Sequence, residues 1–257
     1  MLILIAESKT MRDDPRTVSP DELRDHTPAG QEQASAIMSR LGELSQTELI
    51  AETGLTSTLA LKLREMIYDF PNCLTGQKAI EAFTGVVFKA LSYDSLSRDC
   101  RALCDRDVRI VSSLYGLLRP DDIIKSYRLD FTAKAAPGAF ALNSFWKKDD
   151  TIQLVRTIRE GGYNDLLNLL PADAAKCIDW KIVKRFCKVW KADFVEITEG
   201  GKTKTPAANK LKTMRGELLR QILCRDISSV ESLKTIESEN FMAEGTPVYP
   251  DHLQFVC

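Results

Sequence analysis

The sequence is poor in histidine and lacks the residue spacings that are typical of zinc and iron sites. It has only two histidines, His26 and His252, near opposite ends of its 257 residues, and no HxxxH, HxH or CxxC pair occurs. Because zinc and iron sites depend on such spacings, a metalloenzyme is disfavoured. The scarcity of histidine also argues against a serine or cysteine nucleophile activated by an imidazole. We therefore expect no metal and no other cofactor.

Long hydrophobic runs are also lacking. The first six residues are apolar, but the charged residues Glu7 and Lys9 follow directly. An apolar run of six residues is too short for a signal peptide or a membrane span. The seven cysteines are odd in number and form no CxxC pair, as in a reducing compartment. We therefore expect a cytoplasmic protein with free thiols and no membrane partner.

Two of these cysteines, Cys100 and Cys104, lie four residues apart in a predicted helix and share one of its faces. We interpret them as small apolar residues that pack inward. A peroxide-sensing thiol pair is the alternative, although no neighbouring residue convincingly lowers a thiol pKa.

What the chain does contain is ordinary for a globular protein, with 44% hydrophobic and 28% charged residues. Short aliphatic runs predict strands, and apolar residues at helical spacing predict helices. Strands are expected at 1–6, 108–111, 166–170, 194–197 and 253–256, and helices at 29–44, 45–53, 57–68, 76–82, 95–106, 142–159 and 207–225. Residues 10–28, with three prolines, are expected to form a loop. No repeat or linker divides the chain, so we predict one mixed α+β domain over 1–257.

The charge is unevenly distributed. The net charge is −1, but residues 176–220 hold twelve basic and five acidic side chains, whereas 226–251 hold six acidic and one basic. This asymmetry indicates one basic face or cleft on an acidic protein, and charges scattered over a solvated surface are the alternative. If the face binds nucleic acid, the candidate phosphate contacts are Lys184, Arg185, Lys210, Lys212 and Arg215.

A helix-hairpin-helix is possible near Gly54. Ser45 and Glu48 have the spacing of a capping box, and a second predicted helix follows the connection at 53–56. The glycine would let the backbone approach a DNA phosphate, and Thr56 or Ser57 would cap the second helix or contact that phosphate. An ordinary antiparallel helical pair is the alternative, since the second glycine common in such hairpins is absent.

The run from Leu114 to Phe131 concentrates tyrosine and arginine around a glycine and a proline. Arg119, Tyr127 and Arg128 suit recognition of a phosphate, a carboxylate or a flat base. Alternatively, the two arginines pair with the acids at 121, 122 and 130 and hold the turn.

This run resembles the central motif of the YaaA family, LYGLLRP followed by D and YRLEM. Further matches follow in the family's order: MLILI with Lys9-Thr10, Ala82-Phe83-Thr84-Gly85, Phe145-Trp146, Asn168-Leu169 and Arg215-Gly216. The chain departs from the family pattern at 6–8, where Ala-Glu-Ser replaces Ser-Pro-Ala, at Asp130, and at 171–174, which lack the family's serine and tyrosine.

The resemblance implies a single cantaloupe-like domain with a helix-hairpin-helix. It also implies a role in surviving hydrogen peroxide, linked to limiting free iron and to DNA repair, with double-stranded or junction DNA bound in a basic cleft. The site residues carried over are Lys9, Arg119, Tyr127, Arg128, Asn168 and Arg215, with Gly54 matched by position.

Two function hypotheses follow. The first is a non-enzymatic DNA-binding protein of the oxidative-stress response. The second is an enzyme that acts on a nucleobase or nucleotide in the cleft, with Lys9, Arg119, Tyr127 and Arg128 as binding or acid–base groups. Both predict that these four residues and Arg215 lie together. The sequence leaves the oligomeric state open.

Overall fold

A mixed sheet of eight strands runs through the protein in the computed structural model, which describes residues 1–12, 14–72, 74–244 and 249–257. The strand order is β10-β11-β8-β7-β1-β4-β5, with β9 beside β8. The strands are β1 (Leu2–Ala6), β4 (Val108–Ser112), β5 (Gly116–Leu118), β7 (Asp165–Asn168), β8 (Lys188–Ile197), β9 (Thr203–Lys204), β10 (Met242–Glu244) and β11 (His252–Val256).

The middle of this sheet is parallel. β1 pairs in parallel with β4 on one side and with β7 on the other, and β7 continues in parallel to β8. Leu2, Ile3, Leu4 and Ile5 are all buried, as expected for a strand that is covered on both faces. Because β1, β4 and β7 are parallel, their carboxyl ends lie at the same end of the sheet. The chain crosses from one side of β1 to the other, so the connections that follow these strands diverge there. In α/β sheets such an end is where ligands bind.

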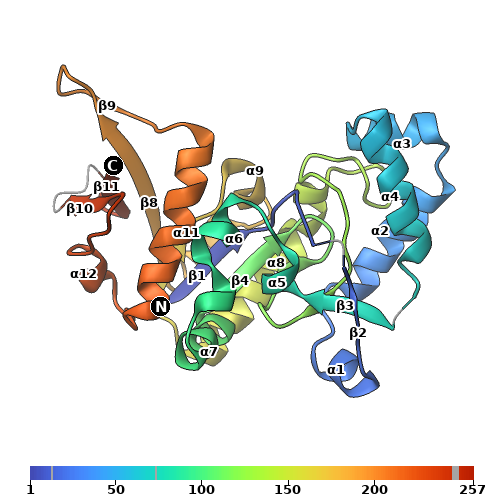
Figure 1. Ribbon diagram of the computed structural model, residues 1–257, viewed down its shortest axis with the longest axis horizontal. Coiled ribbons are helices and arrows are strands. Elements are labelled where there is room, and N and C mark those ends of the chain that lie inside the picture. Colours follow the sequence, from blue (N-terminus) through green and yellow to red (C-terminus); the bar gives the residue numbers. More distant parts are fainter. Residues whose placement is uncertain (13, 73, 245–248) are drawn as a thin grey trace.

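A second group of elements lies at one end of the long axis of the molecule (Figure 1). It contains a three-stranded sheet and four helices: β2 (Arg16–Thr17), β3 (Thr75–Lys78), β6 (Ile123–Ile124), α1 (Pro20–Asp25), α2 (Gln31–Glu43), α3 (Gln46–Thr53) and α4 (Ser57–Asp69). The short helix α5 (Ala79–Ala82) follows β3 toward the middle of the molecule (Figure 1).

The remaining helices pack around the central sheet. They are α6 (Val86–Leu91), the 3-10 turn η1 (Tyr93–Ser95), α7 (Arg98–Asp107), α8 (Leu142–Gly161), α9 (Ala172–Ala175), α10 (Trp180–Val183), α11 (Ala208–Cys224) and α12 (Val230–Leu233). α11 packs against α6 (Figure 1), and the two helices approach closely where Gly216 of α11 meets Val87 of α6. A Cβ atom at Gly216 would lie 2.2 Å from the carbonyl oxygen of Val87, so only glycine allows this approach.

The predicted α+β class is confirmed, and most predicted elements form. Residues 10–28 were expected to be a loop, and that expectation is wrong: they contain β2 and α1, which begins at a Ser19–Glu22 capping box. The expected helix at 76–82 is divided between β3 and α5. Almost all buried hydrophobic residues described belong to one core cluster, Val18 and Ile123 being outside it, and the single-domain assignment over 1–257 stays a prediction.

Across the described ranges, none of the helices combines the length and the apolar character that a bilayer crossing requires.

Candidate functional site

Polar side chains meet where β1 and β4 end. Glu7 directly follows β1, and its backbone N–H donates to the carbonyl of Val111 at 2.9 Å. The backbone N–H of Ser113, directly after β4, donates to Glu7 Oε2 at 2.8 Å. Tyr127 reaches the same oxygen with its hydroxyl and also contacts Ser112 Oγ at 2.7 Å. We call Glu7, Ser112, Ser113 and Tyr127 the carboxyl-edge cluster.

The direction of these hydrogen bonds follows from counting donors. Ser112 Oγ accepts the backbone N–H of Leu114 at 3.2 Å and that of Tyr115 at 2.9 Å, which occupies both of its lone pairs. Its own proton must therefore be donated to the hydroxyl oxygen of Tyr127. Tyr127 in turn donates to Glu7 Oε2. The result is a one-way chain of hydrogen bonds that ends on a carboxylate oxygen.

The two oxygens of Glu7 therefore differ. Oε2 accepts two hydrogen bonds, from Ser113 and Tyr127. Oε1 accepts no hydrogen bond from the described residues. Glu7 is partly exposed, so this oxygen is not buried. Oε1 is thus the oxygen that solvent or a ligand can reach.

Burial also changes the protonation of this cluster. Desolvation raises the pKa of Glu7 to about 7, although the hydrogen bonds from Tyr127 and Ser113 act to lower it. Burial, with the Glu7 charge beside it, raises the pKa of Tyr127 well above 10. Near neutral pH the phenol is therefore neutral, while Glu7 exchanges its proton. Such a group is suited to acid–base chemistry.

Charged residues lie at the rim of the cluster. Lys9, two residues after Glu7, forms an ion pair with Asp130, and Arg128 Nη1 donates to the backbone carbonyl of Lys9. Ser8 Oγ accepts from the backbone N–H of Gly85 at 3.0 Å. The structure therefore brings Lys9, Tyr127 and Arg128 together beside Glu7.

Residues from the family-like motifs support this edge. A Cβ atom at Gly85 would lie 2.5 Å from that of Ser8, so the Ala82–Gly85 motif requires its glycine. Trp146 Nε1 donates to the carbonyl of Ser113 at 2.9 Å. Asn168 ends the neighbouring strand β7, where its Oδ1 accepts from the backbone N–H of Leu170 at 2.9 Å.

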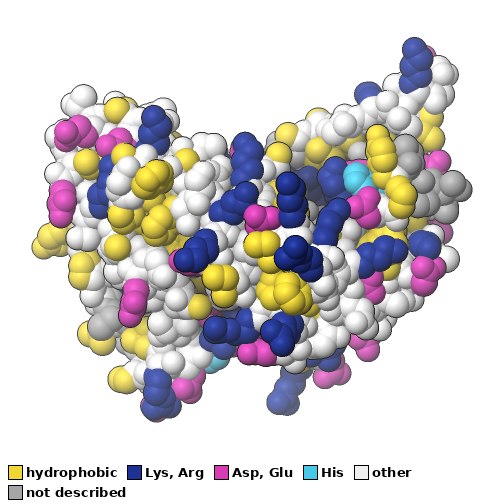
Figure 2. Space-filling view, turned by 180° about the vertical axis from the view of Figure 1, so that it is seen from behind, with side chains coloured by type: hydrophobic (Ala, Val, Ile, Leu, Met, Phe, Trp, Pro, Cys, Tyr) yellow, Lys and Arg dark blue, Asp and Glu magenta, His cyan; other side chains and the backbone are white. Residues whose placement is uncertain are grey.

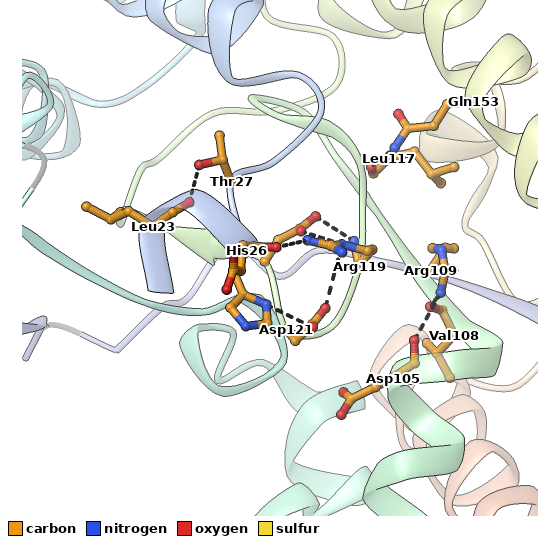
Figure 3. A network of polar contacts seen from close by, with 12 residues as sticks. Leu23, His26, Thr27, Asp105, Val108, Arg109, Leu117, Arg119, Asp121 and Gln153 are labelled. Carbon is orange, nitrogen blue, oxygen red and sulfur yellow. Dashed lines mark hydrogen bonds and ion pairs between the residues drawn. The ribbon is translucent and has the colours of Figure 1, made fainter. Parts of the chain in front are cut away.

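Arg119 lies in a different network, shown in Figure 3. Its Nε donates to Asp122 Oδ1 at 2.8 Å, and its Nη2 donates to the carbonyl of Asp25 at 3.0 Å. Figure 3 shows Arg119 joined to Asp121, whose carboxylate also lies 2.9 Å from His26 Nδ1. Of the two interpretations of Arg119, the structure favours the one in which it holds the turn.

The remaining basic candidates lie elsewhere. Lys184 pairs with Asp251 at 2.9 Å, and Lys210 pairs with Glu196 at 2.7 Å. Burial lowers the pKa of Arg215 on α11, whose nearby charge is Asp193 on β8. None of the contacts among the described residues joins these three to Lys9.

Arg185 and Lys212 are exposed, and neither forms an ion pair within the described part of the chain. Figure 2 shows lysine and arginine gathered across the middle of one face, with acidic side chains among them. The ion pairs of Lys184, Lys191, Lys204 and Lys210 neutralise part of the excess of basic residues at 176–220.

The turn at Gly54 has its own geometry. α3 starts at a Ser45–Glu48 capping box and ends at Gly54, whose φ of 69° is in the left-handed region that favours glycine. Thr56 caps α4 by accepting the backbone N–H of Leu59, and Ser57 is exposed at the start of that helix. Gly54, Thr56 and Ser57 therefore form an outward-facing turn between two helices.

An apolar cavity lies away from this chemistry. It has a volume of about 470 Å³ and is lined by residues of α2, α4 and β6, among them Met38, Ile67 and Ile124. Tyr115 lines this cavity, and the centroid of its ring lies 5.8 Å from the centroid of the Tyr127 ring. The cavity contains none of the predicted site residues.

Burial raises the pKa of five cysteine thiols, those of Cys104, Cys177, Cys187, Cys224 and Cys257. Cys104 is buried, and burial raises its pKa, whereas Cys100 is partly exposed, so only one of the pair packs fully inward. Cys73 lies outside the described residues. Within the described ranges, no group of three or more His, Cys, Asp and Glu side chains could hold a metal ion.

Sequence reasoning missed Glu7, Ser112 and Ser113 as site residues. Each directly follows, or ends, an aliphatic strand, and that position was the available signal. Glu7 stands where the chain departs from the family-like opening motif. The departure introduces the carboxylate at the centre of the carboxyl-edge cluster.

Together, the fold and the cluster define an α+β protein with an acid–base group at the open edge of a parallel sheet. The model of the family described as peroxide stress protein YaaA matches residues 1–246, and the chain belongs to this family. A UPF0246 protein of Parabacteroides distasonis is 32% identical over 252 residues, covering 95% of this chain and 97% of the relative. A UPF0246 protein of Bacteroides fragilis is 30% identical over 243 residues, covering 94% and 92%.

Proposed function

We propose that this protein binds the backbone of duplex or junction DNA as part of the peroxide-stress response, through the turn between α3 and α4. The observation that carries the proposal is the open space at Gly54. A Cβ atom at Gly54 would meet no other atom within 4 Å, so the turn projects freely and an extended phosphate backbone can approach it.

The start of α4 offers hydrogen-bond donors to such a phosphate. Thr56 satisfies the backbone N–H of Leu59, and the backbone N–H groups of Ser57 and Thr58 have no acceptor among the described residues. Free N–H groups and the helix dipole together favour an anion at this position. The motif therefore has the chemistry that a helix-hairpin-helix uses.

Nearby cations support the same proposal. Lys62 is exposed on α4, and Lys134 is exposed on a loop whose backbone N–H donates to the carbonyl of Glu52 at 2.8 Å. Glu52 is the nearest acid of α3, and Arg40 neutralises it. Neither lysine forms an ion pair among the described residues, so both ammonium groups are available to phosphates, as sequence-independent DNA binding requires.

The outline of the molecule is compatible with a long ligand. Figure 2 shows its upper edge hollowed between the two ends of the long axis, and Figure 1 places α3 and α4 at one of these ends. The family's link to peroxide stress supports a role in protecting DNA. The further link to limiting free iron rests on the family resemblance alone.

A matched pair of glycine variants tests the proposal. Gly54 and Gly162 both end a helix at positive φ, and neither has an atom within 4 Å of a Cβ position. Gly54→Val and Gly162→Val should therefore destabilise the protein similarly, by about 1–2 kcal/mol. We expect only Gly54→Val to weaken binding to a fluorescent duplex, by tenfold or more, in an anisotropy titration at several salt concentrations.

Lysine variants extend the test. Lys62→Ala and Lys134→Ala should each flatten the dependence of log K on log salt by about 0.9 if each contacts one phosphate. Binding that is absent or independent of salt in the wild-type protein would refute the proposal. Equal losses in Gly54→Val and Gly162→Val would show that the turn itself makes no contact with DNA.

A further inference from the structure

The carboxyl-edge cluster has a hydrogen-bonding capacity that the fold leaves unused. Glu7 Oε2 is held by Ser113 and Tyr127, which fixes the orientation of the carboxylate and turns Oε1 outward. Building an oriented carboxylate in a desolvated place is costly unless its free oxygen meets a donor. Within the described residues no fold contact supplies that donor, so solvent or a ligand must supply it.

A second atom beside it is also unpartnered. Ser113 is fully buried, and its Oγ accepts or donates no hydrogen bond among the described residues. Its backbone N–H is the group that holds Glu7 Oε2. The fold thus leaves Ser113 Oγ, a buried atom, without a partner among the described residues, whereas buried polar groups are normally satisfied, and it leaves Glu7 Oε1 open to solvent or a ligand.

Cations lie within reach of these two atoms. The Cα atoms of Glu7 and Lys9, two residues apart, can be at most about 7 Å from each other. The Lys9 side chain is 58% exposed, and Arg128 Nη2 has no partner within the described part of the chain. The edge therefore combines hydrogen-bond acceptors in its interior with cations at its rim.

We infer that this edge is a binding site for a nucleoside phosphate, in which Glu7 Oε1 accepts a hydrogen bond from an N–H group of the base and Lys9 and Arg128 bind the phosphate. Every nucleobase carries an N–H donor on its base-pairing edge, which suits the carboxylate oxygen. The ligand is a free nucleotide or an unpaired nucleotide of a DNA strand. The inference does not depend on the proposed DNA-backbone contact at Gly54.

The neighbours of Glu7 determine its response to pH. Tyr127 donates to it, Cys177 lies close enough for their charges to interact, and the Lys9–Asp130 pair lies at the rim. Burial raises the pKa of both Tyr127 and Cys177, so both remain neutral near pH 7. Glu7 is then the group whose ionisation controls whether Oε1 can accept a hydrogen bond from a base.

Calorimetric titration with the four nucleoside 5′-monophosphates tests the inference, with guanosine and inorganic phosphate as partial ligands. At least one monophosphate should bind more tightly than either partial ligand. Glu7→Gln should weaken its binding about tenfold or more, because a neutral amide replaces the charged acceptor. Glu160→Gln, an exposed position on α8, is the matched control and should leave binding unchanged.

Two further readouts separate the roles. Lys9→Ala should weaken binding of the monophosphate but not of the nucleoside. Affinity should fall about tenfold from pH 8 to pH 6, as the ionised fraction of a carboxyl with a pKa near 7 falls. A single-stranded oligonucleotide competing with the monophosphate would identify DNA as the source, and failure to compete would identify a free nucleotide.

The inference is overturned if no monophosphate binds at millimolar concentration, if Glu7→Gln binds as the wild-type protein does, or if inorganic phosphate binds equally well. Failure here is distinguishable from failure of the DNA proposal. Gly54→Val should weaken binding to duplex DNA by tenfold or more while leaving the affinity for the monophosphate unchanged.

Discussion

Replacing Glu7 by glutamine should change how the stability of the protein depends on pH. The pKa of Glu7 is raised from 4.5 to about 7 in the folded protein, chiefly by desolvation. Between these two values the folded state binds more protons than the unfolded state, so the free energy of unfolding falls as pH rises. A shift of this size corresponds to about 3 kcal/mol, lost progressively between about pH 4.5 and pH 7.

Glutamine cannot ionise, so the variant lacks this loss. The amide oxygen of glutamine can still accept from Ser113 and Tyr127, as Glu7 Oε2 does. The stability difference between Glu7→Gln and wild type should therefore move in favour of the variant by about 3 kcal/mol from pH 4.5 to pH 8. For a chain of this length that corresponds to about 6 °C in Tm.

Urea unfolding at half-unit pH intervals, on the wild-type protein and on Glu7→Gln and Glu160→Gln, measures this difference. Other groups with raised pKa values, such as Asp122 and Asp150, titrate in all three proteins and cancel in the comparison. A difference that stays constant with pH would refute the assignment of Glu7 as a desolvated carboxyl that titrates near neutrality.

Three further substitutions test other contacts by urea unfolding. Tyr127→Phe should cost about 1–3 kcal/mol. It should also move the pH midpoint of the Glu7 effect upward, because the Tyr127 hydrogen bond lowers the pKa of Glu7 and its removal raises that pKa. Arg119→Ala should cost about 1–3 kcal/mol at pH 8, where the buried and ionised Asp122 loses its partly exposed partner, and less at pH 5, since the pKa of Asp122 is raised to about 6. Gly216→Ala should cost about 1–3 kcal/mol, because the new methyl group pushes α11 away from α6.

Each of these has an outcome that contradicts it. An unchanged midpoint in Tyr127→Phe would remove the phenol from the Glu7 network. Equal losses at pH 5 and pH 8 would show that the charge of Asp122 does not matter in Arg119→Ala. A neutral Gly216→Ala would mean that the two helices can separate without cost, and the loss should exceed that of Gly200→Ala, where the added methyl group meets no atom and the backbone is not left-handed.

Local signals in the sequence predicted much of the secondary structure. The capping box at Ser45, the helix end at Gly54 and the new helix after Thr56 all depend on residues within four positions of each other, and all three form. The Ser19 capping box was overlooked because three prolines suggested a loop, although proline is favoured in the first turn of a helix, where Pro20 stands.

The sequence by itself determined the aliphatic strands, the helix boundaries and the family, because these depend on short-range patterns and on ordered motifs along the chain. Only the tertiary structure decided which polar residues share a site. Strand pairing brings Glu7 to Ser113 across 106 positions and to Tyr127 across 120, whereas Arg119, eight residues before Tyr127, turns to Asp122 and Asp25. The physical reason is that sheet order and desolvation, which set both these contacts and the pKa of Glu7, are properties of the packed chain and not of any segment.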